Sequence, residues 1–142
     1  MADYASALQA GIDAAKEAGR ARREIREVFD DCAKQVAEAT QGKIRVHIES
    51  LREPPRTLKE MYSLDDSERV TYQAIVASDP TSKDKSTHEL AKWGPSAYGY
   101  PVRVEWGNQD HRCEDKKALS QCLADLLKAP SVGEVFLTLM AE

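Results

Sequence analysis

The sequence predicts an α+β fold, in which a long N-terminal helix precedes an antiparallel sheet of three to four strands and two C-terminal helices. Three observations indicate this class. Small and apolar residues recur at helical spacing over the first 40 positions, alternating segments follow in the middle of the chain, and helical spacing returns after residue 115. Strands followed by helices favour an antiparallel sheet with helices on one face. The expected order over the 142 residues is α-β-β-β-β-α-α.

The N-terminal helix is predicted to begin after Asp3, its N-cap, and to end at Gly42. A seam of small and apolar residues follows alternating steps of four and three and is interrupted only by Arg22, which is the heptad spacing of helices that pack on other helices. Such a helix is roughly 55 Å long, so part of it should project from its own domain. The bulky second half is expected on the domain and the small first half on a partner. The seam consists of Tyr4, Leu8, Gly11, Ala15, Ala18, Ile25, Phe29, Cys32, Val36 and Ala39.

Alternation of apolar and polar residues predicts four strands, the last of them short: residues 43–51, 70–78, 101–106 and 111–113. Residues 107–110 are predicted as the hairpin turn before the last strand. Residues 79–100 are rich in turn-forming residues and are predicted as a long connection, which in a compact domain is typical of a functional loop. Between the first two strands, Thr57 and Glu60 predict one capped helical turn.

Two helices are predicted near the C-terminus. Asp115 is the expected N-cap of the first, and Ser131 with Glu134 forms a capping box that favours helix over strand for the last apolar segment. The predicted organisation therefore has two parts. Residues 1–42 form a long amphipathic helix that partly projects, and residues 43–142 form a single α+β domain.

Composition narrows the function classes. The net charge is −4, and the helix and the remainder are each near −2, whereas a duplex-binding domain normally has a basic surplus. No apolar run approaches the ~18–20 residues of a membrane span, and the N-terminus lacks a signal-peptide pattern. We therefore expect a cytoplasmic protein without membrane contact. Cys32, Cys113 and Cys122 match no zinc spacing and are expected as reduced core thiols, and no motif calls for a metal or cofactor.

Residues of the N-terminal helix are the first candidates for binding another protein. Leu8, Gly11 and Ala15 offer a close contact between helices, and closed two-fold dimers are the commonest assemblies. Arg22, a charge within the seam, either fixes register or partner or extends to water. The expected partner of this helix is a second copy of the chain.

Aromatic residues of the predicted long connection are the second candidates. Trp93 and Tyr98 lie outside the strand pattern, beside Gly and Pro, and are expected as interface anchors. Tyr100 and Trp106 share the parity of the apolar residues in the following strand, so we expect these two in the core.

Nucleic-acid binding is the second function class. The order of a helix, three strands and a helix starting at Lys116-Lys117 resembles the double-stranded RNA-binding domain. However, the first helix is too long, the Gly-Pro-x-His turn is missing and the chain is acidic, so we do not assign it to that family. The polar sheet face that would bind nucleic acid lacks aromatic residues for base stacking and carries Arg45, His47, Arg103 and Arg112.

Catalysis is the third class, and it would use His47 or His111 with Asp110 or Glu114, although nothing in the sequence brings these residues together.

The leading hypothesis is a small cytosolic protein-binding module of the inhibitor, immunity or adaptor type, without catalysis and dimeric through its N-terminal helix. A phage or other mobile-element protein with an assembly role is a further alternative.

Overall fold

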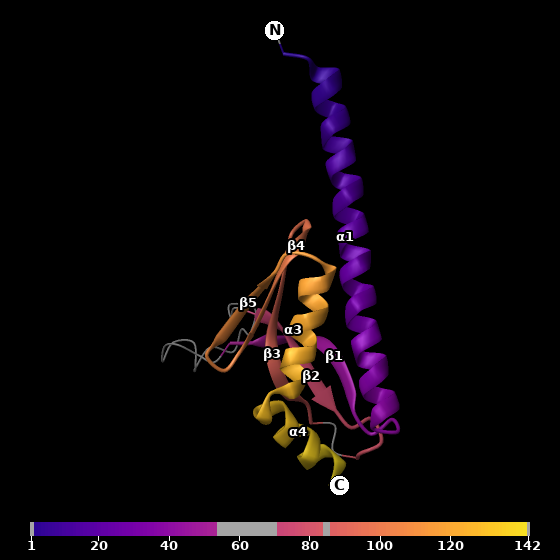
Figure 1. Cartoon of the computed structure of the whole chain (residues 1–142), viewed down its shortest axis with the longest axis vertical. Coiled ribbons are helices and arrows are strands. Elements are labelled where there is room, and N and C mark those ends of the chain that lie inside the picture. Colours follow the sequence, from indigo (N-terminus) through magenta and orange to yellow (C-terminus); the bar gives the residue numbers. More distant parts are fainter. Residues whose placement is uncertain (1, 54–70, 84–85, 142) are drawn as a thin grey trace, which may run out of the picture.

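The structure is a computed structural model of the chain that describes residues 2–53, 71–83 and 86–141. Over these ranges it contains an N-terminal helix, five antiparallel strands in one sheet and two C-terminal helices, which confirms the α+β class (Figure 1). The capped turn predicted at Thr57 and Glu60 lies outside the described residues. The helices are α1 (Tyr4–Ala39), α3 (Lys116–Lys128) and α4 (Pro130–Met140). The strands are β1 (Arg45–Arg52), β2 (Thr71–Ser78), β3 (His88–Ser96), β4 (Gly99–Trp106) and β5 (Gln109–Cys113).

The sheet is a meander in which each strand pairs with the next, so its order is β1-β2-β3-β4-β5. Ile48 pairs with Ile75 between β1 and β2, and Trp93 pairs with Val104 between β3 and β4. These side chains lie on the face of the sheet that shares one hydrophobic core with α1, α3 and α4. The sheet is therefore covered on one side by helices, as the sequence predicts.

The predicted connection over residues 79–100 is wrong in its second half, because β3 lies there and brings the sheet to five strands. Two features conceal this strand in the sequence. The register shifts opposite Leu90, so that Leu90 and Ala91 are buried in succession and the alternation is broken. Gly94-Pro95 resembles a turn, although Pro95 pairs with Val102 in the sheet.

The turn between β4 and β5 is shorter than predicted. Because β5 begins at Gln109, the turn consists of Gly107 and Asn108 rather than of four residues. Gly107 has a φ of +57°, a conformation that glycine adopts without steric cost.

The predicted helix ends are largely confirmed. Asp3 caps α1 by accepting a hydrogen bond from the Ser6 amide (3.1 Å), and Asp115 caps α3 in the same way. Gly42, with a φ of +79°, closes the turn that follows α1.

The capping box predicted for the last helix is wrong, although the helix itself is confirmed. It begins at Pro130 with Ala129 as N-cap and has no side-chain cap, so Ser131 already lies within the helix. Proline suits the first helical position because its fixed φ is helical and the amide hydrogen that it lacks has no partner there.

The helix α1 consists of two different halves. Residues 4–17, which we call the projecting half, are exposed throughout and extend beyond the sheet and the other helices (Figure 1). Residues 18–39, the docked half, supply apolar side chains to the core. The buried residues of α1 are Ala18, Ala21, Ile25, Val28, Phe29 and Val36.

Candidate protein-binding surface

The projecting half carries exposed apolar side chains along one side. Tyr4 is 81% exposed, Leu8 66% and Ile12 41%, which is far more than such residues show in a core. Exposed apolar patches are a common feature of interaction sites in soluble proteins, so this side of α1 is a candidate binding surface. We call this surface the stripe, and it comprises Tyr4, Leu8, Gly11, Ile12 and Ala15.

The seam predicted from heptad spacing does not stay on one side of α1. A straight helix drifts by about 20° per heptad relative to a 3.5-residue repeat, and only a supercoiled partner would correct this drift. The docked half instead buries Ala21 and Val28, which the heptad pattern omits, while Ala39 is exposed. The heptad pattern also omits Ile12, which the helical period of 3.6 residues would have included in the stripe.

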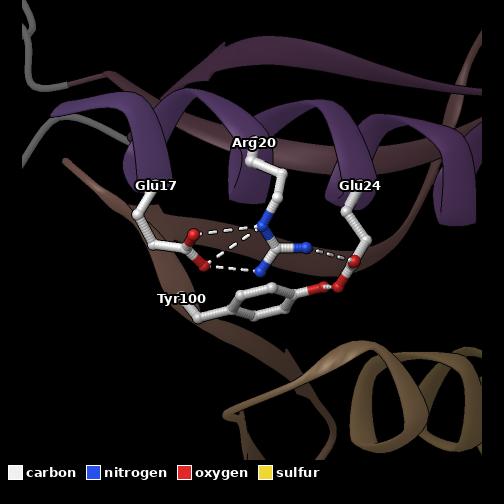
Figure 2. Close-up of polar contacts among 4 residues, drawn as sticks. All are labelled: Glu17, Arg20, Glu24 and Tyr100. Carbon is white, nitrogen blue, oxygen red and sulfur yellow. Dashed lines mark hydrogen bonds and ion pairs between the residues drawn. The ribbon is translucent and has the colours of Figure 1, made fainter. Parts of the chain in front are cut away.

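A polar network fixes α1 on the sheet where the two halves meet (Figure 2). The Tyr100 hydroxyl on β4 donates to Oε1 of Glu24 at 2.8 Å. The Arg20 guanidinium lies between Glu17 and Glu24 and donates to both carboxylates, with Nε 3.1 Å from Glu17 Oε2 and Nη1 3.2 Å from Glu24 Oε2. Hydrogen bonding and charge from Arg20 lower the pKa of Glu17, and burial, followed by the bond to Glu24, raises the pKa of Tyr100.

The turn between β3 and β4 touches α1 at the same level. Arg22 Nη2 donates to the Ala97 carbonyl oxygen at 2.8 Å, an intramolecular contact that neither sequence interpretation included. Gly99 has a φ of +107°, and a Cβ atom there would lie 2.8 Å from Cβ of Ala21. Glycine is therefore required at this position both by the backbone conformation and by the close approach of the helix.

The two predicted aromatic anchors have opposite environments. Trp93 is only 6% exposed on β3 and packs on Phe29 with ring centroids 5.5 Å apart, so its predicted loop position is wrong. Tyr98 is 74% exposed between β3 and β4 and remains available to a partner. Tyr100 and Trp106 were both expected in the core. Trp106 is buried there as predicted, whereas Tyr100 is only half-buried.

A groove of about 730 Å³ lies between the docked half of α1 and strands β1 to β3. This groove was not predicted from the sequence, because it depends on how α1 crosses the sheet. The spacing of Ala33 and Ala37, two small residues one turn apart, is a local signal for it. Apolar side chains form its walls: Ile25, Phe29, Ala33, Ala37, Val46, Ile48, Trp93 and Pro95. Charged side chains also line it: Arg22, Arg26, Asp30, Lys34 and Arg45.

The polar face of the sheet carries arginines that are paired with neighbouring carboxylates. Arg103 forms an ion pair with Asp110, and Arg112 Nε is 3.5 Å from Glu114 Oε1. These two carboxylates are the ones that the catalytic hypothesis assigned to a histidine.

The histidines of that hypothesis lie at opposite edges of the sheet, His47 on β1 and His111 on β5. His111 Nε2 is 2.9 Å from Gln109 Oε1, and the His111 ring stacks on Trp106 with centroids 4.5 Å apart. His47 Nε2 is 3.8 Å from Glu49 Oε1. The structure therefore does not bring the two histidines together.

The three cysteines are free, and Cys113 and Cys122 are buried as predicted, whereas Cys32 is half-buried. Burial raises the pKa of all three thiols, that of Cys122 to about 12. In the described part of the chain, no group of three or more potential ligand residues is placed to hold a metal ion.

Comparison of the chain with known protein families, curated proteins and solved structures gave no match. Among the helices of the described ranges, none is long and apolar enough to cross a membrane.

Proposed function

We propose that this protein is a non-catalytic protein-binding module that forms a homodimer through the projecting half of α1. The observation that supports this function is the stripe, which extends over about three turns of helix and is exposed in the single chain. Complete burial of an exposed leucine such as Leu8 contributes about 1.5–3 kcal/mol. A second copy is the simplest partner because a two-fold interface uses the same surface twice.

The docked half prepares the projecting half for binding. An isolated helix shorter than about 12–15 residues is marginal in water, because its first turn is costly to form. Here the projecting half continues a helix that is already anchored by its core contacts and by the Tyr100–Glu24 hydrogen bond. Binding therefore loses less conformational entropy than the folding of a free peptide would.

The test is the absolute mass of the protein by light scattering after size exclusion. We expect a dimer for the natural chain and a monomer for the variant Leu8→Glu/Ala15→Glu, because two charges would be buried in the contact. The matched control, Ala10→Glu/Ala14→Glu, adds the same charge to the same exposed turns outside the stripe and should remain dimeric.

A natural chain that is monomeric, or a dimer that the stripe variant leaves intact, would contradict the proposal. Circular dichroism must show that both variants keep the helix and sheet content of the natural chain.

The inhibitor, immunity and adaptor types, and an assembly role in a phage, all require a surface that remains open in the dimer. The exposed Tyr98 and the polar sheet face supply such surfaces. The neighbouring genes would separate these types, since an adjacent toxin gene favours immunity and adjacent structural phage genes favour assembly.

A further inference from the structure

The groove and the stripe lie on the same side of α1. Five turns of an α-helix contain about 18 residues, so residues separated by that number point in the same direction. Tyr4, Leu8 and Ala15 of the stripe are followed at this distance by Arg22, Arg26 and Ala33, all of which line the groove. The same holds for the two remaining stripe residues, Gly11 and Ile12, which are followed by Phe29 and Asp30.

We propose that the groove is the receptor for the projecting half of a second copy, in an antiparallel two-fold pairing of α1 centred between residues 20 and 21. This inference rests on the proposed dimer and adds its geometry. When two helices pair antiparallel through one face, the first half of each meets the second half of the other. Both stripes are then covered and both grooves are filled, whereas a parallel pairing would join the stripes and leave the grooves empty.

Side-chain sizes are complementary along this pairing of the two α1 helices. At the outer end, the large Tyr4 and Leu8 fall opposite the small Ala37 and Ala33. Bulky residues that meet small ones allow two helices to interdigitate closely. Ile12 falls opposite Phe29, which is an apolar contact on both sides.

Nearer the centre the sizes are reversed. Ala15 falls opposite Arg26 and Gly19 opposite Arg22, so that small residues leave room for the long arginine side chains. A small residue thus meets a large one at the centre and at the outer end of the pairing, and the apolar pair of Ile12 and Phe29 lies between them.

The glycines of α1 support a close approach of a partner. A Cβ atom added at Gly11 or Gly19 would meet nothing within 4 Å, so packing within the single chain does not require either glycine. Glycine within a helix destabilises it relative to alanine. An opposing helix that approaches these positions gives a physical reason for both residues.

The charges of the two surfaces and the area of their contact also favour a second copy as the occupant of the groove. The projecting half carries two acidic side chains and one basic side chain, whereas the groove is lined by four basic side chains and one acidic, and opposite net charges favour association. Each inserted segment is about 21 Å long and about 10–12 Å wide. Two insertions, counted on both surfaces, cover on the order of 1,000 Å², about the size at which a specific interface becomes stable.

Disulfide trapping tests the pairing. In a Cys32→Ser background, the variant Leu8→Cys/Ala33→Cys should form covalent dimers under mild oxidation, detected on a non-reducing gel. The control Leu8→Cys/Gln35→Cys places the second thiol on the side of α1 that faces away from the groove, and it should not crosslink. Leu8→Cys alone should not crosslink either, because the two copies of residue 8 lie at opposite ends of the pairing.

A second variant separates packing in the dimer from helix stability. Gly19→Ala should raise the dimer dissociation constant by about tenfold or more, because the added methyl group overpacks the contact. It should also increase the thermal stability of the monomer, because alanine favours the helix. Gly133→Ala in α4, where a Cβ atom also meets nothing within 4 Å, is the control and should leave the dissociation constant unchanged.

Crosslinking of Leu8→Cys alone, or equal crosslinking of both double variants, would overturn the antiparallel pairing, as would a dimer that Gly19→Ala strengthens. If the pairing fails one of these tests while the natural chain still forms a dimer that Leu8→Glu/Ala15→Glu dissociates, the proposed function stands and only the geometry is wrong. A monomeric natural chain would instead contradict the proposed function itself.

Discussion

Tyr100 shows how one hydroxyl group can join distant parts of the sequence. Its donor bond to Glu24 spans 76 positions of the chain and holds β4 against the middle of α1. Because Glu24 also accepts from Arg20, the carboxylate is held in place by the helix itself (Figure 2). The phenol is kept protonated by burial and by the neighbouring carboxylate, so its pKa is raised above the ordinary value of 10.

We predict that Tyr100→Phe lowers the free energy of unfolding near pH 7 by about 1.5–3 kcal/mol, the range of hydrogen bonds to charged groups. A group whose pKa is raised by folding contributes stability below its unfolded pKa, and this contribution is lost as the pH rises toward the folded value. The difference between the natural chain and the variant should therefore shrink above pH 10. Urea unfolding at several pH values measures it.

The control for this prediction is Tyr98→Phe, because Tyr98 is highly exposed. Its unfolding free energy should match that of the natural chain across the same pH range. Equal effects of the two substitutions, or a Tyr100 effect that grows above pH 10, would show that the hydroxyl does not stabilise the folded chain in this way.

At the scale of elements, α1 is one continuous helix whose two halves are stabilised differently. The docked half packs apolar residues such as Phe29 against Trp93 on β3, whereas the projecting half is exposed and makes local bonds along α1, such as the Asp3 cap. Most helical stability in proteins comes from tertiary packing rather than from intrinsic propensity. The projecting half therefore depends on the docked half to remain helical.

We predict that Phe29→Ala lowers the free energy of unfolding of the monomer by about 3–5 kcal/mol, as large-to-small changes in a core do. Leu8→Ala should change the monomer by less than about 0.5 kcal/mol, because an exposed side chain loses no packing. Urea unfolding followed by tryptophan fluorescence, at protein concentrations low enough to dissociate a dimer, distinguishes the two. Similar losses for both would mean that the projecting half packs on its own chain.

For the whole molecule, the structure separates the hydrophobic core from the surface that we propose for association. The hydrophobic core is formed by the sheet, α3, α4 and the docked half, and the projecting half contributes no residue to it. Removing the projecting half should therefore remove the contact with a partner and leave the fold intact.

We predict that a chain lacking residues 2–16 folds and unfolds at a urea concentration that is independent of protein concentration. The full chain should become more resistant to urea as its concentration rises, because association stabilises the folded state by mass action. Unfolding curves over a hundredfold range of protein concentration provide the measurement. A concentration-dependent midpoint in the shortened chain would place the dimer contact elsewhere.

Local signals predicted much of this molecule. Asp3, Asp115 and Gly42 mark helix ends because a cap or a left-handed turn depends on a few neighbouring residues. Alternation in β1 and β4 indicates a strand with one buried face. The length of α1 indicates that its first turns are exposed, because a helix of this length exceeds the width of a small domain.

The amino-acid sequence by itself thus determined the helices, most of the strands and their order, since these follow from interactions between residues that are close in the chain. Only the tertiary structure decided the fifth strand, the burial of Trp93, the contact of Arg22 with Ala97 and the groove. Each of these depends on the register between strands or on the angle at which α1 crosses the sheet. Such quantities are set by packing between distant segments, so no local pattern of residues specifies them.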